Sequence, residues 1–307
     1  MVLLAGVALL GSACAVSKRR VVAPSARRPA LEATADQLIE QYNRQARAVS
    51  SLNAGVELNP VAGSSYSGVI EDYHDIRGFI LAQKPAHIRM IGQAPVVAKN
   101  IFDMVSDGET FRIFIPPKNK FVVGPTELER PAKKPIENLR PQHLLEALFW
   151  PELPAGRRVL FEEFDTETLG GASGTVTAPG RYYILTVLRE PPGLEIARKV
   201  WFDRTDLGIA RIQIYAAAGR VVADISYADW QPALQREAPA GPDREASADV
   251  RYPRHIRLAR PRDDYQLEVR ITKLTLNETI TADRFRLDQP PGTELVRVGE
   301  GSAEARP

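Results

Sequence analysis

The feature that most constrains this fold is a repeated alternation of apolar and polar residues with a period of two. It runs through residues 110–115, 219–227 and 265–273. Successive side chains of a β-strand point to opposite faces, so each segment forms a strand with one apolar and one polar face. About a dozen such segments, separated by turn residues, predict a mainly β protein with a large antiparallel sheet or open barrel of roughly 11–12 strands.

Two helices interrupt this strand pattern. Thr34 and Gln37 have the spacing of a capping box, and apolar residues recur at helical spacing from Leu38 to Leu52. This pattern predicts an amphipathic helix with one apolar stripe ahead of the sheet. A second, short helix is predicted over residues 141–150, and Asp107–Gly108 is typical of a tight hairpin turn.

The first fourteen residues have the pattern of a secretion signal. Residues 1–10 are apolar or glycine, too short a run to span a bilayer, and small residues then lead to Cys14. Because Cys14 is the only cysteine, an exported domain has no disulfide to form with it, and the residues before it resemble a lipobox. We expect residues 1–14 to be a lipoprotein signal peptide and Cys14 to carry the lipid. An ordinary signal peptide cut near Ala13 or Ala15 is the alternative.

The remaining chain divides by composition. Residues 15–33 are basic and contain proline, which predicts a flexible tether lying on anionic head groups or in solvent. Residues 34–298 carry the helix and strand patterns and are expected to form a single domain. Residues 232–248 lack periodicity and predict a mobile loop, and residues 299–307 predict a disordered tail.

The sequence holds no pattern typical of an active site. Its 40 Lys and Arg are interspersed with 38 Asp and Glu, which makes nucleic acid a poor ligand. The four histidines have no metal-ligand spacing, and nucleotide-binding and hydrolase motifs are missing from the sequence. Acidic clusters at residues 71–75 and 162–167 are better explained as solvated strand-edge charges than as a catalytic pair. We expect no enzymatic activity, no metal and no cofactor.

Several short motifs resemble those of the bacterial lipoprotein carrier and receptor family, LolA and LolB. One resembles the family's first strand motif, a second its hairpin and a third its closing segment, and the similarity in pattern covers about residues 34–298. The chain is thereby similar to a divergent, lipid-anchored member. The matching residues are Lys84, Pro85, Ile88, Arg89, Ser106, Asp107, Gly108, Phe111, Pro116, Phe285, Pro290, Pro291 and Gly292.

The resemblance implies an unclosed β-barrel around an apolar cavity, which the N-terminal helix helps to cover and which receives acyl chains. Lys84 stands where the carrier has a lid-contacting arginine, and its ammonium cannot reproduce a planar fork. Val96 and Val97 correspond to the receptor's protruding apolar loop. The candidate cavity residues are Leu38, Tyr42, Val49, Phe111, Ile113, Ile115, Val221, Ile225, Leu267, Val269 and Ile271.

These features together predict a lipid-anchored envelope protein that faces the periplasm and binds acyl chains of lipids or lipoproteins. Ala15 follows Cys14 where many inner-membrane lipoproteins have aspartate, which favours the outer membrane. Two alternatives stay open at this point. The core is packed with no room for a ligand, or the same fold binds a partner protein of the envelope as a non-enzymatic accessory protein.

Overall fold

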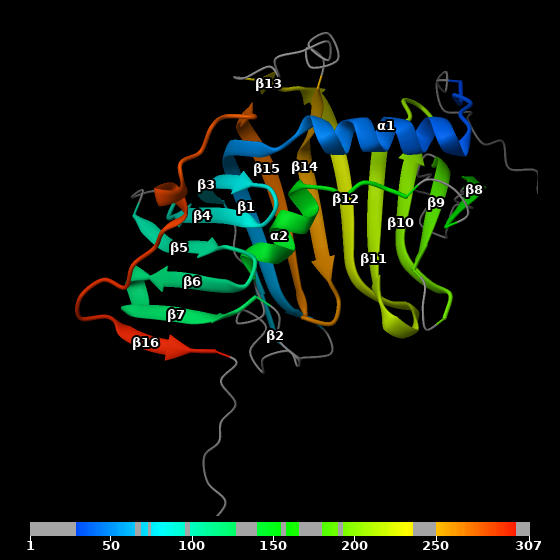
Figure 1. Ribbon diagram of the computed structural model, residues 1–307. Coiled ribbons are helices and arrows are strands. Elements are labelled where there is room, and N and C mark those ends of the chain that lie inside the picture. Colours follow the sequence, from blue (N-terminus) through cyan, green and yellow to red (C-terminus); the bar gives the residue numbers. More distant parts are fainter. Residues whose placement is uncertain are drawn as a thin grey trace, which may run out of the picture.

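A strongly curved sheet organises the chain in the computed structural model (Figure 1). The structure describes residues 29–64, 69–72, 75–95, 99–126, 140–154, 158–165, 180–189, 193–235 and 250–298. Within them, 14 strands follow one another in the order β16-β7-β6-β5-β4-β3-β1-β15-β14-β12-β11-β10-β9-β8, and β2 and β13 pair beside this path. The predicted mainly β fold, an unclosed sheet with an N-terminal helix and a short inserted helix, is confirmed.

The elements have the following bounds. The strands are β1 Ser51–Ser64, β2 Val69–Asp72, β3 Ile76–Gln83, β4 His87–Gln93, β5 Asn100–Ser106, β6 Thr110–Ile115, β7 Lys120–Pro125, β8 Val159–Asp165, β9 Arg181–Arg189, β10 Glu195–Asp203, β11 Ile209–Ala216, β12 Arg220–Pro232, β13 Leu234–Gln235, β14 Arg251–Arg260, β15 Tyr265–Leu276 and β16 Glu294–Arg297. The helices are α1 Ala35–Ala48 and α2 Pro141–Leu148, with short 3-10 helices at η1 Pro116–Lys118, η3 Ala217–Gly219 and η4 Ala282–Phe285.

The sheet has two halves that meet at the long strands β1 and β15. Strands β3 to β7 lie on one side and β14 to β8 on the other, and Figure 1 shows the two sets running in different directions. The pairing of β1 with β15 joins Leu52 to Leu276, so the first and last long strands of the domain close the centre of the sheet. The right-handed twist between neighbouring strands accumulates over so many strands, which bends the sheet instead of leaving it flat.

Helix α1 begins where the capping box predicts. The Thr34 side chain accepts a hydrogen bond from the Gln37 backbone N–H, and the Gln37 side chain accepts one from the Thr34 N–H. The helix ends at Ala48, earlier than the predicted Leu52, because Val49 is already extended and Leu52 belongs to β1. The side chain of Asn277 holds this end, donating to the Ala48 carbonyl at 2.8 Å.

Both helices cover the same face of the sheet, which we call the inner face. Figure 1 shows α1 lying across strands β9 to β14 and α2 lying in the bend between the two halves. Helix α2 ends at Leu148, two residues before the predicted end. The next two residues, Phe149 and Trp150, continue as buried, non-helical chain.

The strand alternation predicted for β12 and β15 is confirmed. In β15 the side chains of Tyr265, Leu267, Val269 and Ile271 are buried, whereas those between them are more exposed. The hairpin between β5 and β6 is also present. There the Asp107 carboxylate accepts hydrogen bonds from the backbone N–H groups of the two residues that follow Gly108, at 2.9 and 2.8 Å.

Three details differ from the prediction. The path holds 14 strands where 11–12 were expected, because short strands such as β8 and β16 alternate too weakly to be recognised. Two short strands pair in parallel, β16 with β7 and β13 with β15, in a sheet that is otherwise antiparallel among the described residues. The predicted loop 232–248 begins as strand, since residue 232 ends β12 and residues 234–235 form β13, while residues 236–248 lie outside the described residues.

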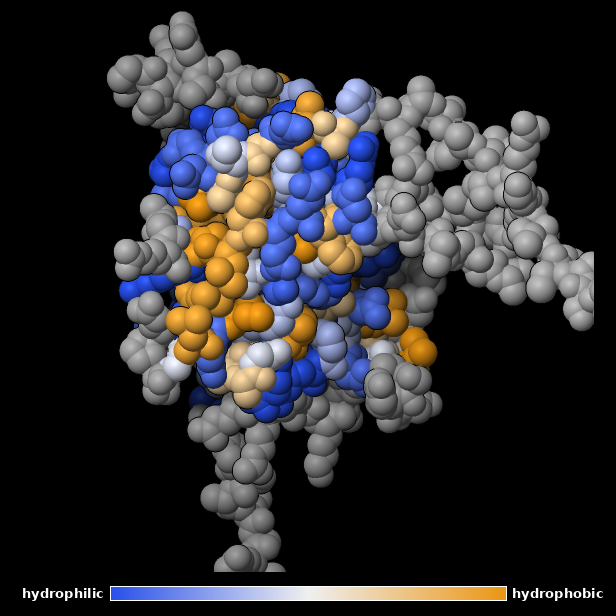
Figure 2. Space-filling view, turned by 90° about the vertical axis from the view of Figure 1, so that its right-hand side faces the viewer, coloured by the Kyte–Doolittle hydropathy of each residue, from blue (hydrophilic) through white to orange (hydrophobic). Residues whose placement is uncertain are grey.

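Among the described residues, strand β8 pairs only with β9 and forms one edge of the sheet, and Figure 2 looks onto this side of the molecule. A band of hydrophobic residues runs down this side beside a band of hydrophilic ones. Leu160 and Phe161 of β8 are 52% and 42% exposed, and Glu162, Glu163 and Asp165 are exposed as the sequence suggested for edge charges. Charges at an edge strand hinder pairing with other chains.

Candidate functional site

The apolar stripe of α1 packs onto the inner face. Leu38, Tyr42 and Ala46 of the stripe are at most 2% exposed and belong to one core cluster with the sheet and α2. Because these positions lie three to four residues apart, they share one face of the helix. The helix therefore covers apolar surface of the sheet that would otherwise face solvent.

Side chains of α1 also fasten the helix to backbone groups of the surrounding chain. Gln41 Nε2 donates to the Leu207 carbonyl at 2.8 Å, and Gln45 Nε2 donates to the Arg251 carbonyl at 2.6 Å. Asn43 exchanges two hydrogen bonds with the backbone of Leu153, at 2.7 and 3.0 Å. A few hydrogen bonds of this kind are individually weak, about 1 kcal/mol each, so the helix is held mainly by its apolar face.

Lys84 contacts the C-terminal end of α1. Its Nζ donates to the Ala46 carbonyl at 2.5 Å and lies 5.6 Å from the centre of the Phe149 ring. Burial lowers the pKa of Lys84, and the charge of Glu152 raises it in part. An ammonium placed at the last helical carbonyls is favourable because those carbonyls have no partner within the helix.

We expect Lys84→Met to loosen this end of α1. The substitution keeps the apolar stem and removes the bond to Ala46, which should lower the free energy of unfolding by about 1–2 kcal/mol. Urea denaturation measures the loss, and amide hydrogen exchange should show faster exchange in α1. Lys273→Met, at an exposed lysine of β15, is the matched control. Equal effects of the two substitutions would contradict a holding role for Lys84.

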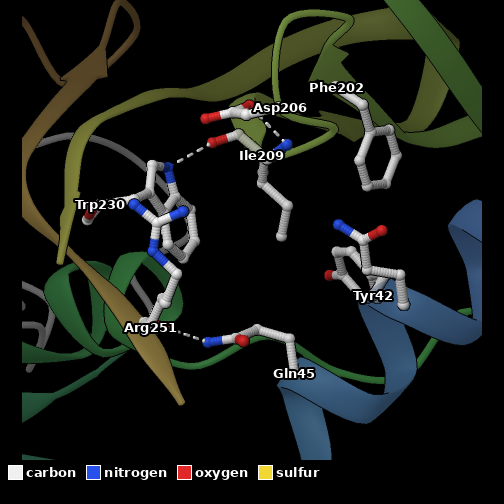
Figure 3. Close-up of a pocket in the computed structure, with 9 residues that line it drawn as sticks. Tyr42, Gln45, Phe202, Asp206, Ile209, Trp230 and Arg251 are labelled. Carbon is white, nitrogen blue, oxygen red and sulfur yellow. Dashed lines mark hydrogen bonds between the residues drawn. The ribbon is translucent and has the colours of Figure 1, made fainter. Parts of the chain in front are cut away.

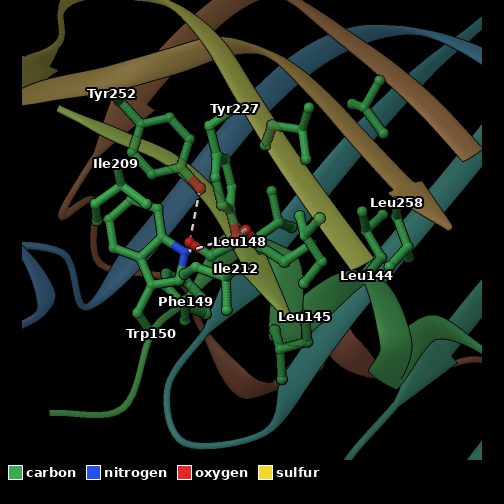
Figure 4. Close-up of a cluster of buried hydrophobic side chains, with 14 of the residues drawn as sticks. Leu144, Leu145, Leu148, Phe149, Trp150, Ile209, Ile212, Tyr227, Tyr252 and Leu258 are labelled. Carbon is green, nitrogen blue, oxygen red and sulfur yellow. Dashed lines mark hydrogen bonds between the residues drawn. The ribbon is translucent and has the colours of Figure 1, made fainter. Parts of the chain in front are cut away.

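A cluster of buried side chains that includes Trp150, Tyr227 and Tyr252 lies beside α2 (Figure 4). Trp150 is 3% exposed, stacks on Tyr252 with ring centres 6.1 Å apart, and donates its indole N–H to the Tyr227 hydroxyl at 2.9 Å. The hydroxyls of Tyr227 and Tyr252 donate to the carbonyls of Ala147 and Leu148, at 3.0 and 2.7 Å. These tyrosines satisfy carbonyls at the end of α2, which a buried helix end requires.

A pocket of about 210 Å³ opens between α1 and the sheet (Figure 3). Its apolar wall consists of Tyr42, Phe202, Ile209 and Trp230, brought by α1, β10, β11 and β12. The Trp230 ring is fixed there because its N–H donates to the Ile209 carbonyl at 3.1 Å. The pocket is smaller than the roughly 300–1,000 Å³ of typical ligand sites.

The rim of this pocket is polar. Gln41, Gln45, Asp206 and Arg251 line it, and Figure 3 shows Asp206 and the Arg251 guanidinium both toward Trp230, with Tyr42 and Phe202 across the space. A pocket with an apolar wall and a few polar groups at its mouth is suited to an amphiphile. Sequence reasoning missed this rim, because its four residues come from three segments and no local pattern marks them.

Most of the eleven residues predicted to line the cavity lie in the core of the structure. Of the eleven, only Tyr42 also lines the pocket. Seven belong to the main core cluster, whereas Phe111, Ile115 and Val221 lie outside it and Ile113 at its margin. Their contact with an acyl chain stays a prediction and requires α1 to move. The seven are Leu38, Tyr42, Val49, Ile225, Leu267, Val269 and Ile271.

The remaining site predictions fall on other parts of the chain. Cys14, Val96 and Val97 lie outside the described residues. Within the described ranges, no group of three or more metal-ligating side chains comes together. Neither of the described helices is long and apolar enough to cross a bilayer.

The architecture thus defines a class: an unclosed antiparallel sheet whose inner face is covered by an amphipathic helix. No protein-family model matches the chain, and no curated protein matches it. Solved structures with a similar arrangement include a LolA superfamily protein from Nitrosomonas europaea, at a TM-score of 0.44 and 10% identity, covering 83% of this chain and 99% of that one.

Two further solved structures have a sequence identity and a TM-score in the same low range. A putative outer membrane lipoprotein-sorting protein domain from Vibrio parahaemolyticus has a TM-score of 0.38 and 8% identity, covering 82% of this chain and 97% of that one. A DUF1329 family protein from Desulfovibrio piger has a TM-score of 0.45 and 9% identity, covering 82% and 96%. The first two carry descriptions of the kind that the sequence motifs indicated.

Proposed function

We propose that this protein is a lipid-anchored envelope protein that binds an acyl chain between α1 and the inner face of the sheet, without catalysing a reaction. The observation that carries the proposal is the position of α1. The helix covers apolar sheet surface, and a pocket with an apolar wall opens along its flank. The motifs around Lys84 and Ser106 support the same function.

A long acyl chain requires α1 to move, because the pocket holds only about 210 Å³. The helix joins β1 through Val49 and Ser50, and Lys84 and Asn277 hold it at that end. A swing about this end would separate the polar contacts of Gln41 and Gln45 first. The apolar surface exposed by the swing is covered again by the acyl chain, at about 0.8 kcal/mol for each methylene buried.

A fluorescent fatty acid titrated into the full chain tests this proposal. We expect saturable binding of one molecule per chain, energy transfer from tryptophan to the probe, and faster amide exchange in α1 but not in β5 and β6. Native mass spectrometry of protein extracted from the envelope should also show bound lipid. A probe that does not bind, together with lipid-free protein, would contradict acyl binding.

The alternative is an accessory protein that binds an envelope protein through the same fold. Two observations favour it: the packed core under α1, and the free edge strand β8, where Leu160, Phe161 and Phe164 are exposed. An edge strand with unpaired backbone groups can accept a strand from another chain. If the protein takes up no fatty acid, even at high probe concentration, binding of a partner protein would be better supported than binding of an acyl chain.

Cys14→Ala tests the anchor. We expect the chain with its native Cys14, which carries the lipid, in the membrane fraction and the variant in the soluble fraction. Loss of the acyl chains removes far more membrane-binding energy than the basic residues 15–28 supply. Fractionation followed by immunoblotting measures the distribution. Ser17→Ala, close to the same site, is the control. Membrane association that survives Cys14→Ala would show that another feature holds the protein.

A further inference from the structure

Two opposite charges at the rim of the pocket have no ion-pair partner in the described part of the chain. The Arg251 guanidinium donates to the Trp230 carbonyl, and the Arg251 backbone carbonyl accepts from Gln45, so the residue is held at the start of β14. Asp206 lies in the turn between β10 and β11, where its Oδ1 accepts from the Gly208 N–H at 2.8 Å. Each charge is positioned by backbone contacts and is exposed.

The two charges border one apolar space. Phe202 and Ile209 are 0% and 4% exposed, and together with Tyr42 and Trp230 they form the apolar wall of the pocket. Figure 3 shows the side chains surrounding one space, with Asp206 and the Arg251 guanidinium both toward Trp230 and with Tyr42 and Phe202 across from them. A ligand that enters here meets a cation, an anion and an apolar surface together.

The charge balance of the rim distinguishes between classes of amphiphile. A fatty acid carboxylate satisfies Arg251 alone and is repelled by Asp206. A head group with a phosphate and an ammonium satisfies both, since phosphate is a good partner for guanidinium and ammonium for carboxylate. A neutral glycerol ester gains neither interaction.

We infer that the mouth of the pocket selects zwitterionic amphiphiles, binding their phosphate at Arg251 and their ammonium at Asp206 while the acyl chain enters between Tyr42 and Phe202. This inference rests on the proposed acyl binding and adds the class of head group to it. Because both charges are exposed, the selection is modest: each ion pair at a solvated site changes affinity by about fivefold at most.

Three single-chain probes of equal acyl length, used below their critical micelle concentrations, test the inference. They are lysophosphatidylethanolamine, lysophosphatidylglycerol and monoacylglycerol, titrated into the full chain by calorimetry. We expect the first to bind most tightly. Arg251→Gln should lower the affinity for both phosphate-bearing probes by about threefold to fivefold. Asp206→Asn should lower the affinity for lysophosphatidylethanolamine alone.

Controls separate the two proposals. Arg257→Gln and Asp288→Asn remove an exposed cation and an exposed anion that do not line this pocket, and neither should change the order of affinities. Equal binding of all three probes, unchanged by the rim substitutions, overturns the head-group inference and leaves acyl binding standing. Absence of binding for every probe overturns both.

Glycerophosphoethanolamine, which lacks the acyl chain, should bind far more weakly than the lysolipid. Equal binding of these two probes would also contradict the inference.

Discussion

Trp150→Ala is expected to lower the free energy of unfolding by about 3–5 kcal/mol, the range measured when a large buried aromatic is truncated. Trp150 is 3% exposed and lies between α1, α2 and the sheet. Its ring centre is within 6.4 Å of the ring centres of Tyr42, Tyr227, Trp230 and Tyr252. Removal leaves a cavity with aromatic walls on several sides, and such a site cannot easily collapse.

Urea denaturation followed by circular dichroism measures this loss. Trp150→Phe keeps a ring but removes the hydrogen bond to Tyr227, so it should cost less, about 1–2 kcal/mol. Leu234→Ala, at a side chain that is 76% exposed, should change stability by less than about 0.5 kcal/mol. A loss below about 1 kcal/mol for Trp150→Ala would show that the indole is not a central packing element.

The sequence predicted those parts of the fold that depend on neighbouring residues. The capping box at Thr34 and Gln37 placed the start of α1 correctly, because both of its hydrogen bonds lie within the first turn. The alternation in β12 and β15 assigned their inner faces, since the period of two is a local property of the strand. The turn at Gly108 was visible for the same reason.

The parts that depend on distant residues were not predictable. Strand β1 lies between β3 and β15. Its pairing with β15 joins residues more than 200 positions apart, such as Leu52 and Leu276. The pocket rim joins Gln45 of α1 to Arg251 of β14, and no sequence pattern reports that proximity. The burial of Trp150 depends on the position of α2 in the bend of the sheet, which no local sequence pattern reports.

The packing under α1 also decides what kind of binding protein this can be. A rigid open cavity would be read directly from its volume, whereas in the proposed function the acyl site forms only when the helix leaves its present position. Seven of the eleven residues that the sequence predicts to contact the acyl chain now belong to the core cluster that includes the apolar face of α1. Helix and ligand then compete for the same apolar surface, so the affinity of the ligand is reduced by the free energy that holds α1 closed.

The fold should unfold at alkaline pH because burial in its core raises the pKa values of four tyrosines. Burial raises the pKa values of Tyr42, Tyr227, Tyr252 and Tyr265 above the ordinary value near 10, against the opposing charge of Arg198 at Tyr42. In the unfolded chain these hydroxyls ionise near pH 10, but in the folded chain they stay neutral. Their contribution to stability is therefore complete below pH 10 and is lost as the pH rises above it.

Each such tyrosine reduces the free energy of unfolding by up to about 1.4 kcal/mol per pH unit, so four together reach at most about 5.6 kcal/mol per unit. Since domains are stable by about 5–15 kcal/mol, we expect cooperative unfolding between about pH 11 and 13. Urea denaturation at a series of pH values measures the slope, and tyrosinate absorbance should appear together with the loss of secondary structure. In Tyr252→Phe, which removes one ionising group, the slope should be shallower by about 1.4 kcal/mol per unit even though stability at neutral pH falls. Tyrosinate absorbance that develops fully while the fold persists would show that these hydroxyls reach water without unfolding.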